Sequence, residues 1–544
     1  MSTISANITA KETIKVNVAV GSRVTDLGSL FVDVCSYASF SAAIDAIGAS
    51  EKTLLIPNEQ AVSADKTVPS NITLQFLQGG SLNIADTKTV TINGQVEAGL
   101  YQIFSWAGTG RVVFGAGAVL EVYPEWFGAL GDGIQDDTIP FQAALTAVAG
   151  TRNSTVYIPA GIYNITSTLT VSDKTRIVGS GGNWKSEIHF NPTVDNDALF
   201  ENAAGATEDV VFEDFYIHFT NVNAKASGRA FMLNVNAGAY TWIRVMVQGF
   251  TGYAIYHDSA AYDKILDCRF LLNTSAGLPV AVVIYMPTYA NAIIIEGNRF
   301  SLNDFCIKMA NVISLRVNKN CFARNGSMNP TNAKSQISIV TGRCVHLSQN
   351  FYEGEEAIAG EAEVFLSAVK GCTIENEFFD GTYGGVQYTQ IFIQSNTCKG
   401  LSIKNCAFYS PLQFFFLISG HVVETRDNYY QDDYGGVGEI LLYSSLMAMI
   451  NGASLVQTDM LPEFEWNPGN LTDGTGETSG VQAAVGAVVA GDSVEVYPPY
   501  SLQGMLCQGY VNADDNYQVR LQNETGGAID LNNGTWHVKI IKRV

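Results

Sequence analysis

Between residues 263 and 433 short apolar segments alternate with polar turns, and one arrangement recurs seven times. Each copy is a short strand with apolar residues at every second position, then Asn or Cys, one further residue, and Phe or Tyr. Successive aromatic residues lie 30, 22, 30, 26, 30 and 22 residues apart, and a repeat of this length is typical of stacked coils. The copies end at Cys268-Arg269-Phe270, Asn298-Arg299-Phe300, Asn320-Cys321-Phe322, Asn350-Phe351-Tyr352, Asn376-Glu377-Phe378, Cys406-Ala407-Phe408 and Asn428-Tyr429-Tyr430.

The strands before these phrases indicate the kind of solenoid. They are short, rich in β-branched residues and bounded by Gly and Asn, and no helix-length period lies between them. The pattern therefore predicts an all-β chain built as a single-stranded parallel β-helix. We expect the asparagines to form a hydrogen-bonded ladder from coil to coil, and the aromatic residues to stack inside it.

Composition agrees with an all-β chain and narrows the possible partners. Of the 544 residues, 51 are glycine, 47% are hydrophobic and only 15% are charged, which suits a large continuous core. The formal charge of −21 repels polyanions, so we predict no nucleic-acid partner. The longest nearly apolar stretch, Ile440 to Ile450, is too short to cross a bilayer, and we predict no membrane insertion.

The cysteines and the first residues bear on chemistry and location. Most of the nine cysteines occupy strand positions that suit a small apolar side chain, and we interpret them as free thiols. No Cys-x-x-Cys pair and no Cys/His cluster with zinc spacing occurs, so we predict no cofactor and no metal ion.

The chain opens MSTISANITAKETIKV, without a basic segment followed by an apolar one. We expect no signal peptide and synthesis in a cytoplasm.

Composition and turn signals divide the chain into regions. Strand patterns with Gly and Asn turns predict a small set of coils ahead of the main repeat. Pro462, Pro468 and the Gly/Thr-rich stretch that follows indicate a linker. We expect an N-terminal head or arm at 1–30, a β-rich or β-helical region at 31–122, the main β-helix at 123–460 with a capping helix at 138–149, a linker at 461–480, and a β-sandwich-like domain at 481–544.

The most specific motif is Tyr123-Pro124-Glu125-Trp126-Phe127-Gly128-Ala129-Leu130-Gly131-Asp132-Gly133, followed by Asp136-Asp137-Thr138 and the predicted helix. With the later run VYIPAGIYNI, it resembles the opening segment of the pectate-lyase-like superfamily, especially the tailspikes of tailed bacteriophages. The resemblance covers roughly residues 120–460 and implies a right-handed β-helix. It also implies structural roles for Asp132, Asp136 and Asp137, in agreement with turn and cap chemistry. Calcium binding by this acidic cluster is the alternative.

The resemblance further implies a function and an assembly. Tailspikes recognise bacterial surface polysaccharide, such as capsule, O-antigen or exopolysaccharide, and commonly depolymerise it. On this basis we expect a virion tail protein, made in the host cytoplasm and acting outside the cell, that attaches to another tail or adaptor protein. About 60 residues make a marginal C-terminal core, so we also expect a homotrimer, with this domain holding three chains in register or binding sugar.

Candidate catalytic residues follow from the chemistry of glycosidic hydrolysis. Two carboxyl groups are needed, about 5–5.5 Å apart for retention or about 6.5–9.5 Å for inversion, and coils stacked about 4.8 Å apart can supply them. The richest group just after the repeated aromatic positions is Glu353, Glu355 and Glu356 beside Asp380, with Glu375 as a second choice. Candidate substrate-binding residues near the same turns are Tyr352, Tyr383, Tyr388, His346, Arg324 and Asp304.

Other functions stay open at this point. A polysaccharide lyase would use a base and a cation against a uronic acid, and Arg324 or Arg316 near Asp304 is the nearest arrangement. A non-enzymatic spike would bind polysaccharide through shallow grooves and the avidity of three chains. A structural appendage or adhesin would show no polysaccharide specificity.

Overall fold

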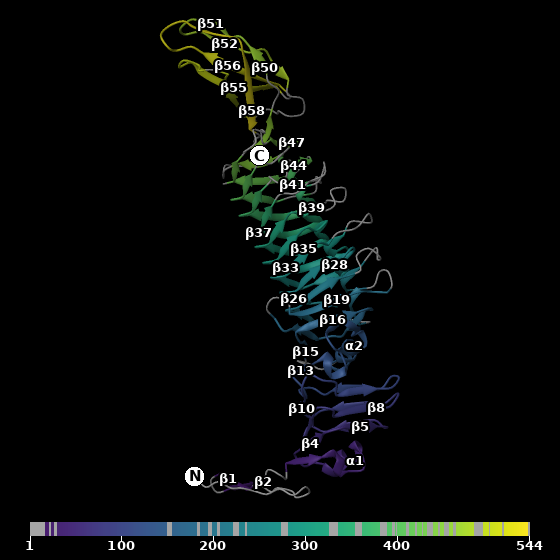
Figure 1. Cartoon of the computed structure of the whole chain (residues 1–544). Coiled ribbons are helices and arrows are strands. Elements are labelled where there is room, and N and C mark those ends of the chain that lie inside the picture. The colour runs from purple at the N-terminus through teal and green to yellow at the C-terminus, as the bar shows by residue number, and fades with distance from the viewer. Residues whose placement is uncertain are drawn as a thin grey trace, which may run out of the picture. The chain divides into compact units, whose positions relative to one another are not determined.

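The computed structural model describes residues 17–20, 23–26, 30–149, 155–181, 185–193, 198–203, 207–220, 228–233, 237–273, 281–325, 336–353, 362–380, 389–393, 398, 400–409, 413–418, 422–426, 428–431, 439–443, 447–450, 456–460, 464–483, 493–499, 501–513 and 516–541. The chain divides into two compact units, residues 1–257 and 258–544. Almost every described element is a strand, and the strands of each coil pair in parallel with the next (Figure 1). None of the described helices is long and apolar enough to span a membrane.

The first unit begins with a short stack of coils, within the residues 31–122 for which the sequence predicts a small β-rich or β-helical region. Its strands form three parallel sheets. Before them lies a two-stranded antiparallel ribbon, β1 (Asn17–Val20) and β2 (Arg23–Asp26). The three sheets contain β3 (Phe31–Asp33), β4 (Lys52–Ile56), β7 (Ile72–Phe76) and β10 (Val96–Glu97); β5 (Glu59–Val62), β8 (Ser81–Ile84) and β11 (Phe104–Trp106); and β6 (Lys66–Val68), β9 (Thr89–Ile92) and β12 (Arg111–Phe114).

A helix that was not predicted from the sequence, α1 (Phe40–Ile47), lies in the chain between β3 and β4. The Ser39 hydroxyl caps it by accepting a hydrogen bond from the backbone N–H of Ala42 at 3.1 Å. Phe40, Ala43, Ile44 and Ile47 are buried, so one face of the helix covers apolar core. The helix thus shields core at the start of the coil stack, as solenoids require.

The motif around Gly128 to Thr138 folds as expected. A 3-10 turn, η3 (Pro124–Phe127), leads into β14 (Asp132–Asp136) and α2 (Thr138–Ala147), which lies within the predicted helix range 138–149 and ends two residues earlier. Asp137 is fully buried at the N-cap position. Its carboxylate accepts hydrogen bonds from the backbone N–H groups of Leu130 at 2.9 Å and Gly131 at 3.4 Å. Asp137 therefore ties the glycine-rich loop to the start of the helix.

Two further acidic residues of the motif also hold the fold together. Asp136 accepts from the Thr138 backbone N–H at 3.0 Å and from the Thr166 hydroxyl at 2.7 Å. The Tyr163 hydroxyl donates to Glu125, whose carboxyl pKa is raised by burial. These contacts join η3 and β14 to β16 (Gly161–Ile165), the parallel neighbour of β14, and the residue after it. They agree with the structural roles that the resemblance implied.

The main coils of the first unit use two parallel sheets. Side chains alternate along strands such as β19 (Ser186–Phe190) and β23 (Tyr216–Phe219), where every second residue is buried in the core. One sheet contains β13 (Glu121–Val122), β15 (Thr155–Ile158), β17 (Leu169–Val171), β18 (Arg176–Gly179), β20 (Ala198–Asn202), β22 (Val211–Glu213), β24 (Arg229–Leu233), β26 (Thr241–Ile243) and β28 (Tyr253–His257), and the other contains β14, β16 (Gly161–Ile165), β19 (Ser186–Phe190), β23 (Tyr216–Phe219) and β27 (Met246–Gln248).

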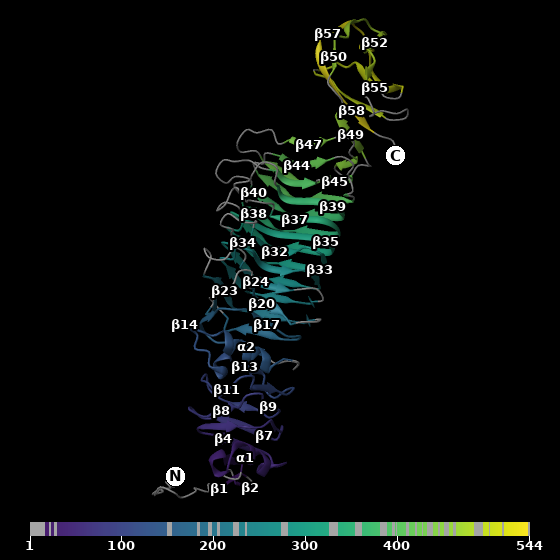
Figure 2. The same ribbon diagram turned by 90° about the vertical axis from the view of Figure 1, so that its right-hand side faces the viewer.

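The second unit has the same kind of architecture over the repeated phrases, and its longest strands lie side by side in Figure 2. One sheet contains β29 (Ser259–Ala261), β30 (Lys264–Leu266), β32 (Val282–Met286), β33 (Tyr289–Glu296), β35 (Phe305–Asn318), β37 (Ile337–Ser348), β39 (Ala362–Glu375), β41 (Thr389–Ile393), β42 (Leu401–Lys404), β44 (Gln413–Ile418), β45 (Val422–Arg426), β47 (Glu439–Tyr443) and β48 (Met447–Ile450). The other contains β31 (Arg269–Leu271), β34 (Arg299–Ser301), β36 (Cys321–Ala323), β38 (Phe351–Glu353), β40 (Phe378–Asp380), β43 (Ala407–Tyr409) and β46 (Tyr429–Gln431).

The asparagine ladder forms as predicted. The Asn320 side-chain oxygen accepts from both the backbone N–H and the amide nitrogen of Asn298, each at 2.9 Å. Asn320 in turn donates in the same way to Asn350. The aromatic residues that follow stack with ring centroids 4.5–5.1 Å apart, and the stack runs Phe270, Phe300, Phe322, Tyr352, Phe379, Phe408.

The predicted repeat is wrong by one residue at a single copy. Phe379, not Phe378, pairs with Tyr352 and enters the stack. Glu377 therefore occupies the ladder position that was assigned to Asn376. Its carboxyl accepts from the Asn350 backbone N–H at 3.2 Å and from the Asn350 amide at 2.9 Å. Burial raises the pKa of Glu377 well above its ordinary value.

A column of left-handed residues stands directly before the ladder. Each has a positive φ, between 53° and 72°. The backbone N–H of this residue, or of the ladder residue after it, donates a hydrogen bond to the following coil. This conformation favours Gly, Asn and Asp, and it turns the chain from one sheet into the next. The column comprises Asp267, Gly297, Lys319, Gln349, Asn376 and Asn405.

The C-terminal region of the second unit is antiparallel and has its own core. The linker predicted at 461–480 is wrong over much of its length, because Phe464, Trp466 and Leu471 lie in strands and contribute to that core. Trp466 and Trp536 pack with ring centroids 5.0 Å apart. The strands are β49 (Val456–Met460), β50 (Phe464–Trp466), β51 (Gly469–Leu471), β52 (Gly476–Thr478), β53 (Gln482–Ala483), β54 (Ser493–Tyr497), β55 (Leu506–Ala513), β56 (Asn516–Gln522), β57 (Ile529–Leu531) and β58 (Gly534–Ile541).

Candidate functional site

Two of the predicted catalytic carboxylates stand on neighbouring coils. Glu353 ends β38 and Asp380 ends β40, and the two residues are direct partners in the parallel register. Both are partly exposed, while the preceding residues Tyr352 and Phe379 are buried in the aromatic stack. Alternation along the strand therefore directs the two carboxylates outward. Equivalent positions on adjacent coils are about 4.8 Å apart.

A second group surrounds Glu375 on the long sheet of the same unit. The Glu375 carboxylate lies 3.4 Å from Nε2 of His346 and 3.0 Å from Nζ of Lys404. The three residues come from β39, β37 and β42, which pair in parallel. The structure thus brings together Glu375 and His346, which were predicted separately, and adds Lys404, which was not predicted.

Arg324 is the predicted substrate-binding cation. It is exposed, has a left-handed φ of 53°, and donates its backbone N–H to the Glu353 carbonyl oxygen at 3.2 Å. Its backbone is therefore held beside the strand that carries Glu353. Contact between its guanidinium group and a glycan stays a prediction.

Two predicted substrate-binding residues are in the wrong place for that role. Tyr352 is 1% exposed, with its ring stacked between Phe322 and Phe379, because it is the aromatic member of its repeat. Asp304 is also fully buried, and its carboxylate accepts from the backbone N–H of Ala281 at 3.4 Å. Neither side chain can contact a polysaccharide on the surface. The remaining predicted residues, Glu355, Glu356, Tyr383 and Tyr388, lie outside the described residues.

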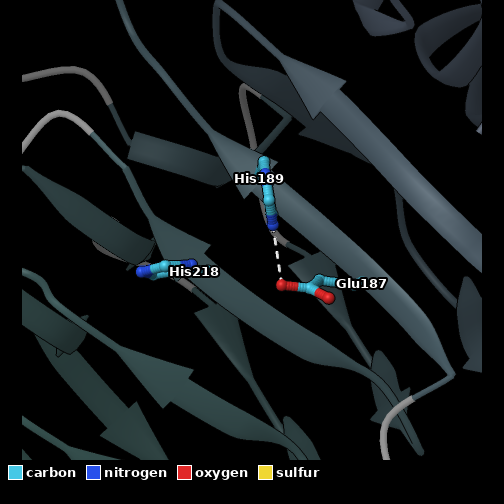
Figure 3. Close-up of side chains that lie close together, drawn as sticks. All are labelled: Glu187, His189 and His218. Atoms are coloured by element: carbon cyan, nitrogen blue, oxygen red, sulfur yellow. Dashed lines mark hydrogen bonds and ion pairs between the residues drawn. The ribbon is translucent and has the colours of Figure 1, made fainter. Parts of the chain in front are cut away.

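A third cluster, on the first unit, was not predicted. Glu187 and His189 project from β19, and His218 projects from the adjacent β23 (Figure 3). Nε2 of His189 lies 2.7 Å from Oε1 of Glu187, and the two imidazole rings meet edge to face with centroids 5.4 Å apart. One donor atom from each of the three side chains lies within 4.8 Å of the others.

Polar neighbours extend this cluster along the same face. The Tyr216 ring stacks on the His218 ring, with centroids 5.7 Å apart. The Tyr216 hydroxyl lies 2.7 Å from Oε1 of Gln248, on the next strand. Burial, with a contribution from the Glu187 charge, raises the pKa of Tyr216 to about 12. Burial, with a contribution from His189, lowers the pKa of His218. At neutral pH the tyrosine is therefore protonated and His218 favours its uncharged form.

The sequence carried a weak signal for this cluster. Both strands contain a polar-x-His pattern, Glu187-Ile188-His189 and Tyr216-Ile217-His218, with an isoleucine that faces the core. The two histidines are 29 residues apart, so their proximity becomes visible only once the coil register is known. The seven-copy repeat that set the register begins after them.

Comparison with known proteins agrees with the fold. The family model described as "Rhamnogalacturonase A/epimerase, pectate lyase-like" matches residues 125–248, the segment that contains the motif and the third cluster. Mannuronan C5-epimerase AlgE2 of Azotobacter vinelandii is 44% identical over 62 residues, which are 10% of this chain and 6% of that protein. This chain therefore matches only a small part of that relative's length.

Solved structures are similar at lower identity. PfbA, a surface adhesin of Streptococcus pneumoniae, is 14% identical, with 62% of this chain and 98% of that chain covered and a TM-score of 0.43. A hyperthermoactive exopolygalacturonase from Thermotoga maritima is 12% identical, with 61% and 92% covered and a TM-score of 0.45. Similarity at this level transfers no residue's role to this chain.

The stacked parallel coils form a parallel β-helix, and residues 125–248 within it are similar to a family described as pectate lyase-like.

Proposed function

We propose that this protein is a bacteriophage tailspike that recognises a bacterial surface polysaccharide and depolymerises it by endo-glycosidic hydrolysis. The observation that carries the proposal is the carboxylate pair Glu353 and Asp380, in register on consecutive coils and partly exposed. The superfamily supports a carbohydrate substrate, since the matching family is described as a rhamnogalacturonase and epimerase family. The sequence resemblance to tailspikes supports the biological role.

The spacing of the pair suits a retaining reaction. Coils separated by about 4.8 Å place equivalent carboxyls near the separation of about 5–5.5 Å that retention needs. One carboxylate attacks the anomeric carbon while the other, protonated, donates its proton to the departing glycosidic oxygen. The second group, now a carboxylate, then takes a proton from water while the water oxygen attacks the anomeric carbon, which breaks the bond between the sugar and the first carboxylate and releases the sugar. Glu375 with His346 is a second acid–base pair on the neighbouring sheet of the same unit.

The test is cleavage of purified polysaccharides from a panel of encapsulated bacteria, followed by mass spectrometry of the released oligosaccharides. Wild type should release discrete repeat-unit fragments, each with one added water. Glu353→Gln and Asp380→Asn should each lower the rate at least about a hundredfold. Glu97→Gln, at an exposed carboxylate on β10, is the matched control and should cleave like wild type.

Two other outcomes would redirect the proposal. Fragments with an unsaturated end would mean elimination by a lyase, and binding without fragments would mean a non-enzymatic spike. Full activity in both carboxylate variants would remove Glu353 and Asp380 from the site and leave Glu375 as the next candidate.

The homotrimer is part of the same proposal. Large apolar side chains remain exposed on the C-terminal strands and turns, among them Leu506 at 64% and Val481 at 55%, and self-association would cover them. Light scattering should then give three times the chain mass of 58.6 kDa. A monomer in solution would contradict it. Attachment through residues 1–30 to another virion protein is proposed on the resemblance alone.

A further inference from the structure

The cluster of Glu187, His189 and His218 takes no part in the proposed hydrolysis. Its side chains leave two adjacent strands on the same face, because the alternate residues Ile188 and Ile217 are fully buried. The register pairs His189 directly with His218. All three polar side chains are partly exposed, with 26% for His189 and 23% for Glu187. They are therefore accessible from solvent but held by a buried framework.

The backbone beneath the cluster is fixed on both sides. β19 pairs with β16 and β23, and β23 pairs with β19 and β27. Donor atoms around a tetrahedral ion, at about 2.0–2.1 Å from it, lie about 3.3 Å apart. The donors here are within 4.8 Å of one another, so the widest possible gap has to close by about 1.5 Å. Side-chain rotation is the movement that has to close it, because strand pairing fixes the backbone.

We propose that Glu187, His189 and His218 form a binding site for a divalent transition-metal ion of the zinc class. Two imidazoles and one carboxylate are a ligand set that such ions use, as in catalytic sites with three protein ligands. Calcium and magnesium prefer oxygen ligands throughout, and two histidines do not suit them. The three ligands and the partial exposure leave a coordination position for water or another oxygen ligand.

Tyr216 borders the site without belonging to it. Its hydroxyl is hydrogen-bonded to Gln248, and its ring packs on His218. It therefore fixes the plane of one ligand ring, as residues around metal ligands commonly do. The proposed site does not depend on the depolymerase function, because none of its residues belongs to the carboxylate groups described for hydrolysis.

The experiment is isothermal titration of the full-length, untagged, chelator-treated protein with ZnCl₂, repeated with CoCl₂ while the visible absorption is recorded. Wild type should bind one ion per chain at this site, and Co²⁺ should give the visible bands of tetrahedral histidine coordination. His189→Ala and His218→Ala should each weaken the binding at least tenfold and abolish those bands, and Glu187→Gln should also weaken it. CaCl₂ should give no heat attributable to the site.

Two controls separate this site from other histidines and from misfolding. His537→Ala removes an exposed histidine of the C-terminal strands, and Tyr216→Phe keeps all three donors; both should bind Zn²⁺ like wild type within about threefold. Circular dichroism should show every variant folded. The proposal is overturned if wild type binds no ion, or if His189→Ala and His218→Ala bind as tightly as wild type. Neither result would affect polysaccharide cleavage, so failure here is distinguishable from failure of the proposed function.

Discussion

Glu377 offers a test of the interior ladder, because it is the carboxyl that replaces an asparagine there. It is buried, and it accepts both donors of Asn350. In the neighbouring rungs an asparagine oxygen accepts the same two donors, and its amide donates onward to a strand carbonyl such as Ile295 or Val317. Glu377→Asn should therefore complete the ladder, with a new bond to the equivalent carbonyl oxygen of Leu347.

The size of the effect depends on pH, because burial raises the pKa of Glu377 in the folded protein. The folded carboxyl keeps its proton to a higher pH than the unfolded one, so unfolding releases a proton above the ordinary carboxyl range near 4.3. Wild-type stability should then fall by up to about 1.4 kcal/mol per pH unit, from that range until the folded carboxyl ionises. Glu377→Asn lacks this loss, but it removes one buried methylene worth about 1 kcal/mol.

The order of stability of wild type and Glu377→Asn should therefore reverse between acidic and neutral pH. Near pH 4 wild type should be equal to or slightly more stable than Glu377→Asn, and near neutral pH the variant should be more stable by about 1–3 kcal/mol. The assay is urea unfolding followed by circular dichroism from about pH 4 to about pH 8. Glu377→Gln, which keeps the side-chain length, is the control for the lost methylene and should show the same slope relative to wild type. A difference that stays constant across this range would refute the reasoning.

Three other substitutions test the packing. Phe379→Ala removes the ring between Tyr352 and Phe408 and should cost about 3–5 kcal/mol of unfolding free energy; Phe378→Ala, outside the stack, should cost clearly less, and equal losses would contradict the corrected register. Asp137→Ala leaves two loop N–H groups without their acceptor and should lower the unfolding free energy by about 1–3 kcal/mol; an unchanged urea midpoint would count against its tying role. Trp536→Ala should lower the melting temperature of the C-terminal strands, because it removes a fully buried ring. The measurement is tryptophan fluorescence on heating, and a melting temperature equal to that of wild type would contradict the prediction.

Much of the fold was predictable because it depends on periodic, local features. Alternating apolar residues before Asn320 and Asn350 indicated strands, and the aromatic spacing indicated coils. The error at Glu377 arose because Asn376 satisfied the asparagine pattern one residue early. Burying a charged carboxylate is costly, so an alignment that placed Glu377 in the interior ladder looked less favourable from the sequence. The helix at Phe40 was missed although Ser39 and the apolar spacing after it are a helix signal.

The candidate sites were less predictable because they depend on register between distant residues. Glu353 and Asp380 were found by aligning coils on the aromatic positions, and the same alignment misjudged Tyr352, which belongs to the core. His189 and His218 lie in coils without the repeated phrase, so the aromatic alignment did not reach them, and their shared polar-x-His pattern is too short to set a register. Side-chain alternation could place each histidine outward, but only strand pairing placed them together.

The left-handed residue before each ladder position has a consequence for how such a chain can be rearranged. The six residues of this column, from Asp267 to Asn405, share one conformation, with coil lengths that differ on either side of it. If the chain were cut at Lys319 and rejoined at the equivalent residue Asn405, the strands, the asparagine ladder and the aromatic stack on either side of the junction would keep their alignment. The turn is therefore a natural splice point for exchanging or deleting whole coils, and surface loops could be transferred there between related β-helices without redesigning the interior.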